Sequence, residues 1–202
     1  MEQAAKAACR VRIAGARSRL SVAERSGAAT ALVAAVTDLL PALPPGPVAA
    51  YASVGTEPGT RRLLTELVGG GREVLLPLLL PDGDLDWARW DGRLRSGPRG
   101  LLQPAGLPLG PGAVGDCPLV VVPALAVDRS GTRLGRGGGS YDRALGRASG
   151  LVVAALHRDE LVAHLPADPH DRPVHAAVVP GEGLVRLHPG APAGAAPGGM
   201  SP

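Results

Sequence analysis

The stretch that most constrains the fold of this chain runs over residues 118–143, PLVVVPALAVDRSGTRLGRGGGSYDR. It starts with the apolar run 119–122, which is typical of a strand buried on both faces of a parallel sheet. A glycine-rich segment follows, and Ser140 is placed to cap a helix that continues through Tyr141. The order of strand, glycine loop and helix predicts an anion-binding loop, because glycines let backbone amides approach a ligand and the helix start adds partial positive charge.

Charged residues beside the glycines point to phosphate in particular. Arg133, Arg136 and Arg143 supply guanidinium donors, and Asp142 is placed to hold a metal ion next to the phosphates. The loop has no Gly-Lys-Ser/Thr of a Walker A motif, and it lacks the first-strand context of a Rossmann fingerprint. In a chain with 29 glycines the loop could also be an ordinary turn. The pattern predicts a phosphate site and leaves the nucleotide open.

The remaining segments alternate between helical and extended patterns. Helices are predicted over 2–19, from a Ser21–Glu24 capping box to about 40, and from Thr56-Glu57-Pro58 to 68. Strands are predicted over 48–53, 73–80, 85–90, 119–122, 151–157 and 176–179, with Pro77 at an end or bulge. Residues 91–117 are predicted as a loop without an assigned function. We predict a mostly parallel α/β domain over 1–188 and a disordered tail over 189–202.

Two further places carry candidate ligand contacts. Lys6, the only lysine of the chain, shares one face of the first helix with Arg10 and Arg17. On an ordinary helix such a face is simply solvated. Glu57 follows the first strand, at the sheet edge where α/β proteins bind ligands. It could equally be an acid in a first helical turn, stabilised by the helix dipole.

Composition narrows the class of protein and its surroundings. The net charge of +3 decides little between a small polyanion and RNA, but the scarcity of aromatic residues disfavours binding of single-stranded nucleic acid. Cys9 and Cys117 have no metal-site or disulfide spacing. No apolar run approaches 20 residues, and the first residues do not look like a signal peptide. We expect a cytoplasmic protein with no nucleic-acid or membrane partner, most simply a monomer.

The segment PALAVDRSGTRLGRGGGSYDR resembles the signature of the 5-formyltetrahydrofolate cyclo-ligase family, also called methenyltetrahydrofolate synthetase. Residues Lys6 and Arg10, and the segments 51–60, 102–104 and 170–171, support the resemblance, which covers roughly 4–186. It implies a three-layer α/β/α fold similar to the ribose-phosphate isomerase and CoA-transferase (NagB/RpiA-like) group. The implied activity is ATP-dependent closure of 5-formyltetrahydrofolate, with or without a polyglutamate tail, to 5,10-methenyltetrahydrofolate, with Mg²⁺.

The resemblance also implies roles for individual residues. ATP would be held by Lys6, Arg10, Arg133, Leu134, Gly135, Arg136, Gly137, Gly138, Gly139, Ser140 and Tyr141. Arg133 and Arg143 would be catalytic, Glu57 and Tyr141 would contact the folate, and Asp142 would hold Mg²⁺, with Asp171 as the next candidate ligand. Arg136 and Ser140 stand where the family often has aromatic residues. A non-catalytic relative that binds nucleotide or RNA, or a sugar-phosphate isomerase on a similar scaffold, are the alternatives.

Overall fold

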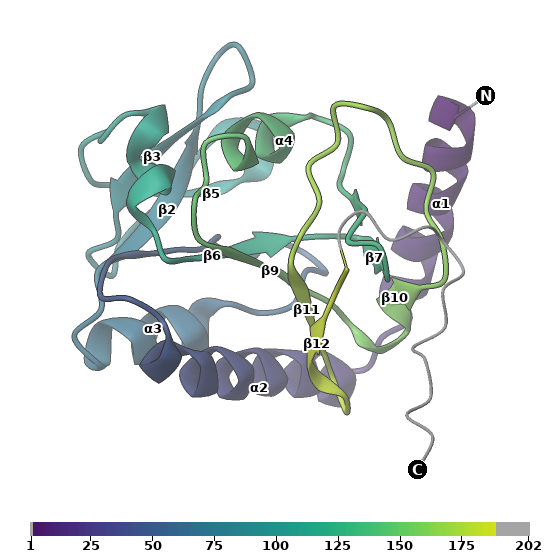
Figure 1. Ribbon diagram of the computed structural model, residues 1–202, viewed down its shortest axis with the longest axis horizontal. Coiled ribbons are helices and arrows are strands. Elements are labelled where there is room, and N and C mark those ends of the chain that lie inside the picture. Colours follow the sequence, from purple (N-terminus) through teal and green to yellow (C-terminus); the bar gives the residue numbers. More distant parts are fainter. Residues whose placement is uncertain (1, 189–202) are drawn as a thin grey trace.

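The structure, a computed structural model, describes residues 2–188 (Figure 1). Its centre is a seven-stranded sheet in the order β12-β11-β9-β6-β1-β2-β3. The parallel strands are β1 (Val48–Ala49), β2 (Val74–Leu79), β6 (Leu119–Pro123), β9 (Leu151–Ala155) and β11 (Ala176–Val179). The edges are antiparallel: β3 (Leu85–Arg89) and β12 (Gly183–Arg186). The predicted mostly parallel α/β fold is confirmed, whereas β12 was not predicted.

Helices cover both faces of this sheet, which gives the three predicted layers. On one face lie α2 (Val22–Leu39) and α3 (Arg61–Gly69), and on the other α4 (Ser140–Leu145) with the 3₁₀ helix η3 (Pro111–Asp116) (Figure 1). The alternation of side chains along β6 explains both cores. Val121 packs in the cluster that includes Leu32 of α2, and Val120 packs in the cluster that includes Ala144 of α4.

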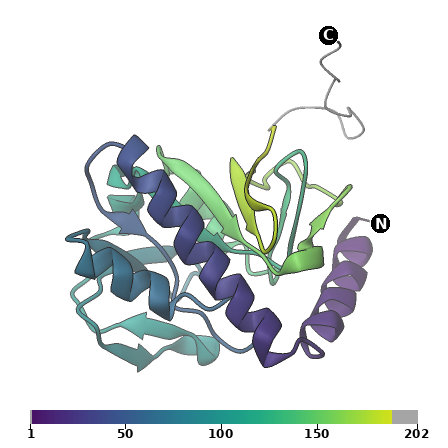
Figure 2. The ribbon, with the colours of Figure 1, turned by 90° about the horizontal axis from the view of Figure 1, so that it is seen from below.

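The first helix, α1 (Glu2–Arg17), stands to one side of these layers (Figure 2). It lies near a small second sheet in the order β10-β7-β8, made of β10 (Leu161–Val162), β7 (Ala126–Asp128) and β8 (Arg133–Leu134). Ile13 of α1 packs with Leu125 and Leu134 in a separate small core. The helix is therefore anchored to the chain segment that carries the glycine loop.

Residues 91–117, predicted as a loop, contain regular structure. A hairpin is formed by β4 (Leu94–Ser96) and β5 (Leu102–Pro104), which pair antiparallel around the 3₁₀ turn η2 (Pro98–Gly100). Inside that turn Arg99 has φ 56° and ψ 26° and is the one non-glycine residue with positive φ in 2–188. The left-handed conformation costs an ordinary residue about 1–2 kcal/mol. There are two further 3₁₀ turns. The turn η1 (Leu40–Ala42) directly follows α2, and η4 (Arg158–Glu160) directly precedes β10.

Several predicted boundaries are wrong. The strand predicted over 48–53 ends at Ala49. The third helix begins at Arg61, because Thr60 Oγ1 donates to the Tyr51 carbonyl (2.7 Å) and holds residues 50–60 as a loop. Gly139 rather than Ser140 precedes α4 as its N-cap. Pro77 does not end β2 but lies opposite Trp87 of β3. Proline is tolerated there because pairing of β2 with β1 ends at Leu75, so no partner strand needs its missing N–H.

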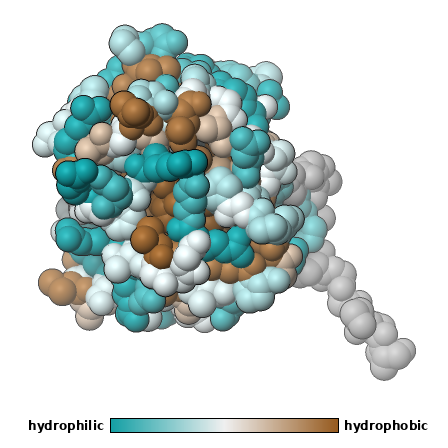
Figure 3. All heavy atoms as spheres, turned by 90° about the vertical axis from the view of Figure 1, so that its left-hand side faces the viewer, coloured by the Kyte–Doolittle hydropathy of each residue, from teal (hydrophilic) through white to brown (hydrophobic). Residues whose placement is uncertain are grey.

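Among the described helices none is both long and apolar enough to cross a membrane. The large apolar side chains that are exposed within residues 2–188 are Val11, Val22, Val68, Leu107 and Leu109. On the face shown in Figure 3, hydrophobic residues form separate patches among hydrophilic ones. The predicted tail, 189–202, lies outside the described residues.

Candidate active site

A cavity of about 340 Å³ opens where β1, β2 and β6 end, at the carboxyl edge of the parallel sheet. Its walls come from α1, the loop after β1, the β4–β5 hairpin and the glycine loop between β8 and α4. The cavity brings together nearly all the residues predicted for ligand contact: Lys6, Arg10, Glu57, Arg133, Leu134, Gly135, Arg136, Gly137, Gly138, Gly139, Ser140, Tyr141, Asp142 and Asp171. Arg143 is exposed and does not line it.

Guanidinium groups surround three consecutive glycines of the loop. A Cβ on Gly137 would lie 3.3 Å from Cζ of Arg10, and one on Gly139 would lie 3.5 Å from Nη1 of Arg143. Between them, a Cβ on Gly138 would lie 3.8 Å from Nη1 of Arg99. Because the glycines have no side chains, positive groups stand close to bare backbone. This arrangement suits a polyanion such as a triphosphate.

Arg133, which precedes the glycines, and Asp142, which follows them, form an ion pair. Nη2 of Arg133 donates to Oδ1 of Asp142 at 2.9 Å, and the Arg133 side chain is 4% exposed. The guanidinium also lies 5.6 Å from the centre of the Tyr141 ring, within the range of a cation–π contact. Burial raises the pKa of the Tyr141 phenol, with the charge of Glu57 adding to the effect, so Tyr141 stays protonated and can donate a hydrogen bond.

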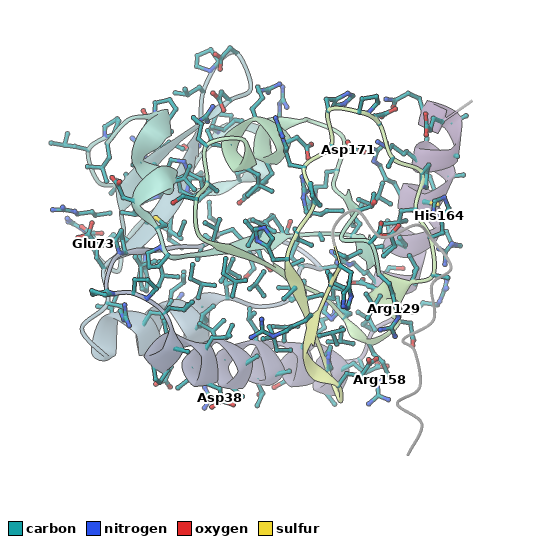
Figure 4. The ribbon with its side chains drawn as sticks, in the orientation of Figure 1. Asp38, Glu73, Arg129, Arg158, His164 and Asp171 are labelled. Carbon is teal, nitrogen blue, oxygen red and sulfur yellow. The ribbon has the colours of Figure 1, made fainter. Side chains whose placement is uncertain are left out.

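Lys6 is held between two carboxylates at the edge of the cavity. Its Nζ lies 2.6 Å from Oδ2 of Asp168 and 2.6 Å from Oδ2 of Asp171. Asp171 belongs to the long connection between β10 and β11 that passes close to α1 (Figure 4). Burial lowers the pKa of Lys6, but the hydrogen bonds to both aspartates outweigh it, and the net pKa is raised. Burial acts to raise the pKa of Asp171, but the hydrogen bonds from Lys6 and from the Asp168 amide, together with the nearby positive charge of Lys6, outweigh it, so that the pKa of Asp171 is lowered.

Asp168, His170 and Asp171 are close enough to share a cation, with one ligand atom from each within 4.8 Å of the others. Lys6 already compensates both carboxylates. The predicted metal ligand Asp171 therefore acts in this structure as the partner of Lys6, while Asp142 lies on the cavity wall with the glycines.

Glu57 lies in the loop after β1, so its alternative role as a first-turn helical acid is excluded. Its side chain is only 8% exposed; Oε2 accepts from the Val54 amide at 2.9 Å, and Oε1 lies 3.2 Å from Nη2 of Arg136. Burial raises the pKa of Glu57, while the Val54 amide and the charges of Arg136 and Arg17 oppose the rise. The Arg136–Glu57 pair links the glycine loop to the opposite wall.

On the basic face of α1, Lys6 and Arg17 are buried and Arg10 is partly buried, which excludes the interpretation of that face as simply solvated. Arg10 Nε donates to the Gly135 carbonyl at 2.9 Å. Arg17 makes two bonds to Glu160, with Nε–Oε1 at 2.6 Å and Nη2–Oε2 at 2.7 Å. These contacts fix the helix to the glycine loop at Gly135 and to the turn η4 at Glu160.

Sequence reasoning missed several residues of this site. No local sequence pattern marks Glu160 as a site residue, because its partner Arg17 is 143 positions away in the chain. His157 Nε2 lies 2.9 Å from the Thr56 carbonyl and supports the Glu57 loop, although its segment was predicted only as a buried strand. The apolar wall formed by Leu101 and Leu102 comes from the region predicted as a loop.

Fold and cavity define an α/β protein with a cation-lined, glycine-rich ligand site at the carboxyl edge of a parallel sheet. The model of the 5-formyltetrahydrofolate cyclo-ligase family matches residues 2–180. The 5-formyltetrahydrofolate cyclo-ligase of Mycolicibacterium smegmatis is 41% identical over 148 residues, 69% of this chain and 76% of that protein. The chain belongs to the 5-formyltetrahydrofolate cyclo-ligase family.

Two solved structures share the fold. The NMR structure of Aquifex aeolicus 5,10-methenyltetrahydrofolate synthetase has a TM-score of 0.77 and 28% identity, and the match covers 92% of this chain and 94% of that one. The 5,10-methenyltetrahydrofolate synthetase from Mycoplasma pneumoniae has a TM-score of 0.68 over 86% of this chain and 97% of that one. At 18% identity the second likeness concerns the fold alone.

Proposed function

We propose that the cavity is the active site of an ATP-dependent 5-formyltetrahydrofolate cyclo-ligase, with the phosphates of ATP on the glycine loop and the folate beside Glu57. As a member of its family, the protein has 5-formyltetrahydrofolate cyclo-ligase activity, the conversion of 5-formyltetrahydrofolate to 5,10-methenyltetrahydrofolate. One observation carries the assignment of the site: a single cavity is lined by both the glycine loop and Glu57.

The reaction needs activation of a poor electrophile. The formyl carbon is unreactive because the nitrogen lone pair is delocalised into the carbonyl. In the proposed sequence the formyl oxygen attacks the γ-phosphorus of ATP, ADP leaves, and an iminium phosphate forms. The neighbouring nitrogen then attacks the formyl carbon and loses its proton, and phosphate leaves as the ring closes. These steps need positioning and charge neutralisation more than an enzyme nucleophile.

The residues present suit those needs. Arg10 and Arg133 place guanidinium groups at the glycine loop, and Lys6 adds an ammonium group at its edge. Fixed donors of this kind stabilise the charge that develops during phosphoryl transfer. Arg143 donates to the Gly83 carbonyl (2.5 Å) from outside the cavity lining, so we assign the catalytic guanidinium to Arg133.

Asp142 fits the role of Mg²⁺ ligand. Its side chain lines the cavity and is 18% exposed, and within residues 2–188 no hydrogen bond to its Oδ2 is formed. A hard carboxylate oxygen facing the phosphate loop is what Mg²⁺ takes from a protein that binds it mainly through phosphates. When bound there, Mg²⁺ would neutralise phosphate charge. Arg133 holds the carboxylate in place.

The direct test measures ADP release by the purified protein with and without 5-formyltetrahydrofolate, together with formation of the methenyl product. We expect ADP release that depends on the folate and equals the product formed. ATP binding without folate-dependent ADP release would instead identify a non-catalytic relative.

A second test addresses Asp142, for which a merely structural role is the alternative. Asp142→Asn keeps the shape but removes the charge. As a metal ligand the residue should be needed for turnover, which we expect to fall by orders of magnitude and to recover in part at high Mg²⁺. As a first-turn acid it would contribute about 0.3–1 kcal/mol to stability and little to activity. Near-normal turnover of the variant at low Mg²⁺ would contradict the metal assignment.

A further inference from the structure

The β4–β5 hairpin carries an arginine that the reaction above does not use. Arg99 lines the cavity from the hairpin turn, and its Nη1 approaches Gly138 in the middle of the glycine loop. Arg10 of α1 and Arg143 of α4 approach the glycines on either side of Gly138. Arg143 does so from outside the cavity lining, so α1 and the hairpin, which are far apart in the sequence, are the elements that each direct a guanidinium at this loop from within the cavity.

The backbone of this turn does not favour arginine. Arg99 and Gly100 both have positive φ, 56° and 72°, inside a turn closed by a 3.1 Å bond from the Leu101 amide to the Pro98 carbonyl. Turns with two successive positive φ values favour Asn-Gly or Gly-Gly, because glycine has no Cβ to crowd the carbonyl oxygen and the short asparagine side chain can hydrogen-bond to the local backbone. Asparagine or glycine at position 99 would fit the turn better. A residue kept in an unfavourable backbone conformation at a cavity is a reason to look for a functional role.

The guanidinium of Arg99 is also available for a ligand. Arg99 is an exposed residue at the mouth of the cavity, and within residues 2–188 its guanidinium forms no hydrogen bond or ion pair with the protein. Every other cationic side chain of the lining has an acceptor: Lys6 has two aspartates, Arg10 a carbonyl, and Arg17, Arg133 and Arg136 each a carboxylate. Arg99 is thus the cation of the described lining whose donors all remain free.

We propose that Arg99 is a substrate-binding residue that donates to an anionic oxygen held over the glycine loop. The inference rests on the proposed function and adds a contact to that site. Two groups of the substrates offer such oxygens, the phosphates of ATP and the carboxylates of the glutamate tail of the folate. The position over Gly138 favours phosphate, because the glycine loop is the phosphate-binding element.

The test compares Arg99→Asn with Arg99→Lys and with Arg95→Asn. Asparagine suits positive φ, so the first variant removes the charge without straining the turn. Arg95 lies on β4 of the same hairpin, is exposed and does not line the cavity, so its variant loses the same charge from the same element. The measurements are kcat, KM for ATP, KM for mono- and triglutamyl 5-formyltetrahydrofolate, the melting temperature, and ATP affinity by calorimetry without folate.

We expect Arg99→Asn to raise KM and Kd for ATP roughly tenfold, as for loss of one charge-assisted hydrogen bond. Its melting temperature should be unchanged or higher, Arg99→Lys should recover part of the affinity, and Arg95→Asn should behave as wild type. Loss of affinity with gain of stability is a combination that a structural role does not produce.

Each remaining outcome has a definite meaning. A rise confined to KM for the triglutamyl folate would identify the glutamate tail as the source of the anion at the proposed subsite. Unchanged values for ATP and for both folates would overturn the proposal. If the wild-type protein failed to turn over, the proposed function would fail, while the calorimetric comparison of wild type with Arg99→Asn would still decide the role of Arg99.

Discussion

The first two helices follow one another in the chain but are attached to the molecule by different interactions. Helix α2 buries Ala28, Leu32 and Val36, and its contact with the sheet and with α3 is apolar. Helix α1 buries two cations, Lys6 and Arg17, around a single large apolar residue, Ile13. An apolar face can be satisfied by many neighbours, whereas a buried cation needs an acceptor at a fixed place. The α2 contact mainly stabilises the fold, and the α1 contact positions charges at the cavity.

The largest effect on stability should come from breaking the best-buried pair of α1. Arg17→Leu leaves Glu160 buried without its partner, and such a loss typically costs about 3–5 kcal/mol. Denaturant unfolding of the variant and of Arg17→Leu/Glu160→Leu would measure it, and the double variant should recover much of the loss. A single variant as stable as wild type would show that the buried ion pair is not needed to hold α1 in place.

Truncation on α2 should affect stability alone. Leu32 is 1% exposed, and Leu32→Ala should cost roughly 2–5 kcal/mol through lost burial and a cavity. Because α2 does not line the cavity, KM for ATP and for the folate should not change at a temperature where the variant is folded. A clear change in either KM would mean that the apolar layer also sets the geometry of the site.

This difference also explains what could be predicted from the sequence. The parallel strands, α2 and the glycine loop were predictable because local patterns specify them: apolar runs, a capping box at Ser21 and Glu24, and clustered glycines. The bond of Thr60 to Tyr51, which delays the start of α3, depends on a loop conformation that no local pattern reports. Glu160 and Asp168 were missed because their partners on α1 are more than 140 positions away in the chain.

Lys6 tests whether the buried charges of α1 act on the ligand. Lys6→Met should raise KM for ATP by roughly tenfold, since it removes one charged donor from the edge of the glycine loop. Arg12→Met, on the exposed face of the same helix, is the matched control and should leave KM unchanged. Equal KM values for wild type and Lys6→Met would restrict Lys6 to its two aspartates.

The stabilities of wild type and Lys6→Met should also depend differently on pH. The lowered pKa of Asp171 means that its stabilisation is present above its ordinary value of 3.8 and is lost as the pH falls through the folded-state pKa. The raised pKa of Lys6 means that its stabilisation persists up to 10.5 and is lost above it. The difference in unfolding free energy between wild type and Lys6→Met should therefore be constant from about pH 5 to 9 and shrink in acid. A difference that grows as the pH falls would contradict the ion pairs.

The smallest expected effect is a shift in a pH profile, and it concerns the pair that spans the cavity. Burial raises the pKa of Glu57, and the positive charges that face it, Arg136 from the glycine loop and Arg17 from α1, hold it down. Arg136→Met removes one of them, so the pKa should rise further. If the Glu57 carboxylate binds the folate, the acid limb of kcat/KM for the folate should move to higher pH, Arg136→Lys should move it back, and Arg12→Met should leave it in place. If the acid limb of Arg136→Met stays at the wild-type pH, Glu57 is not the group whose titration it reports. If the limb moves to lower pH, the charge of Arg136 does not lower the pKa of Glu57.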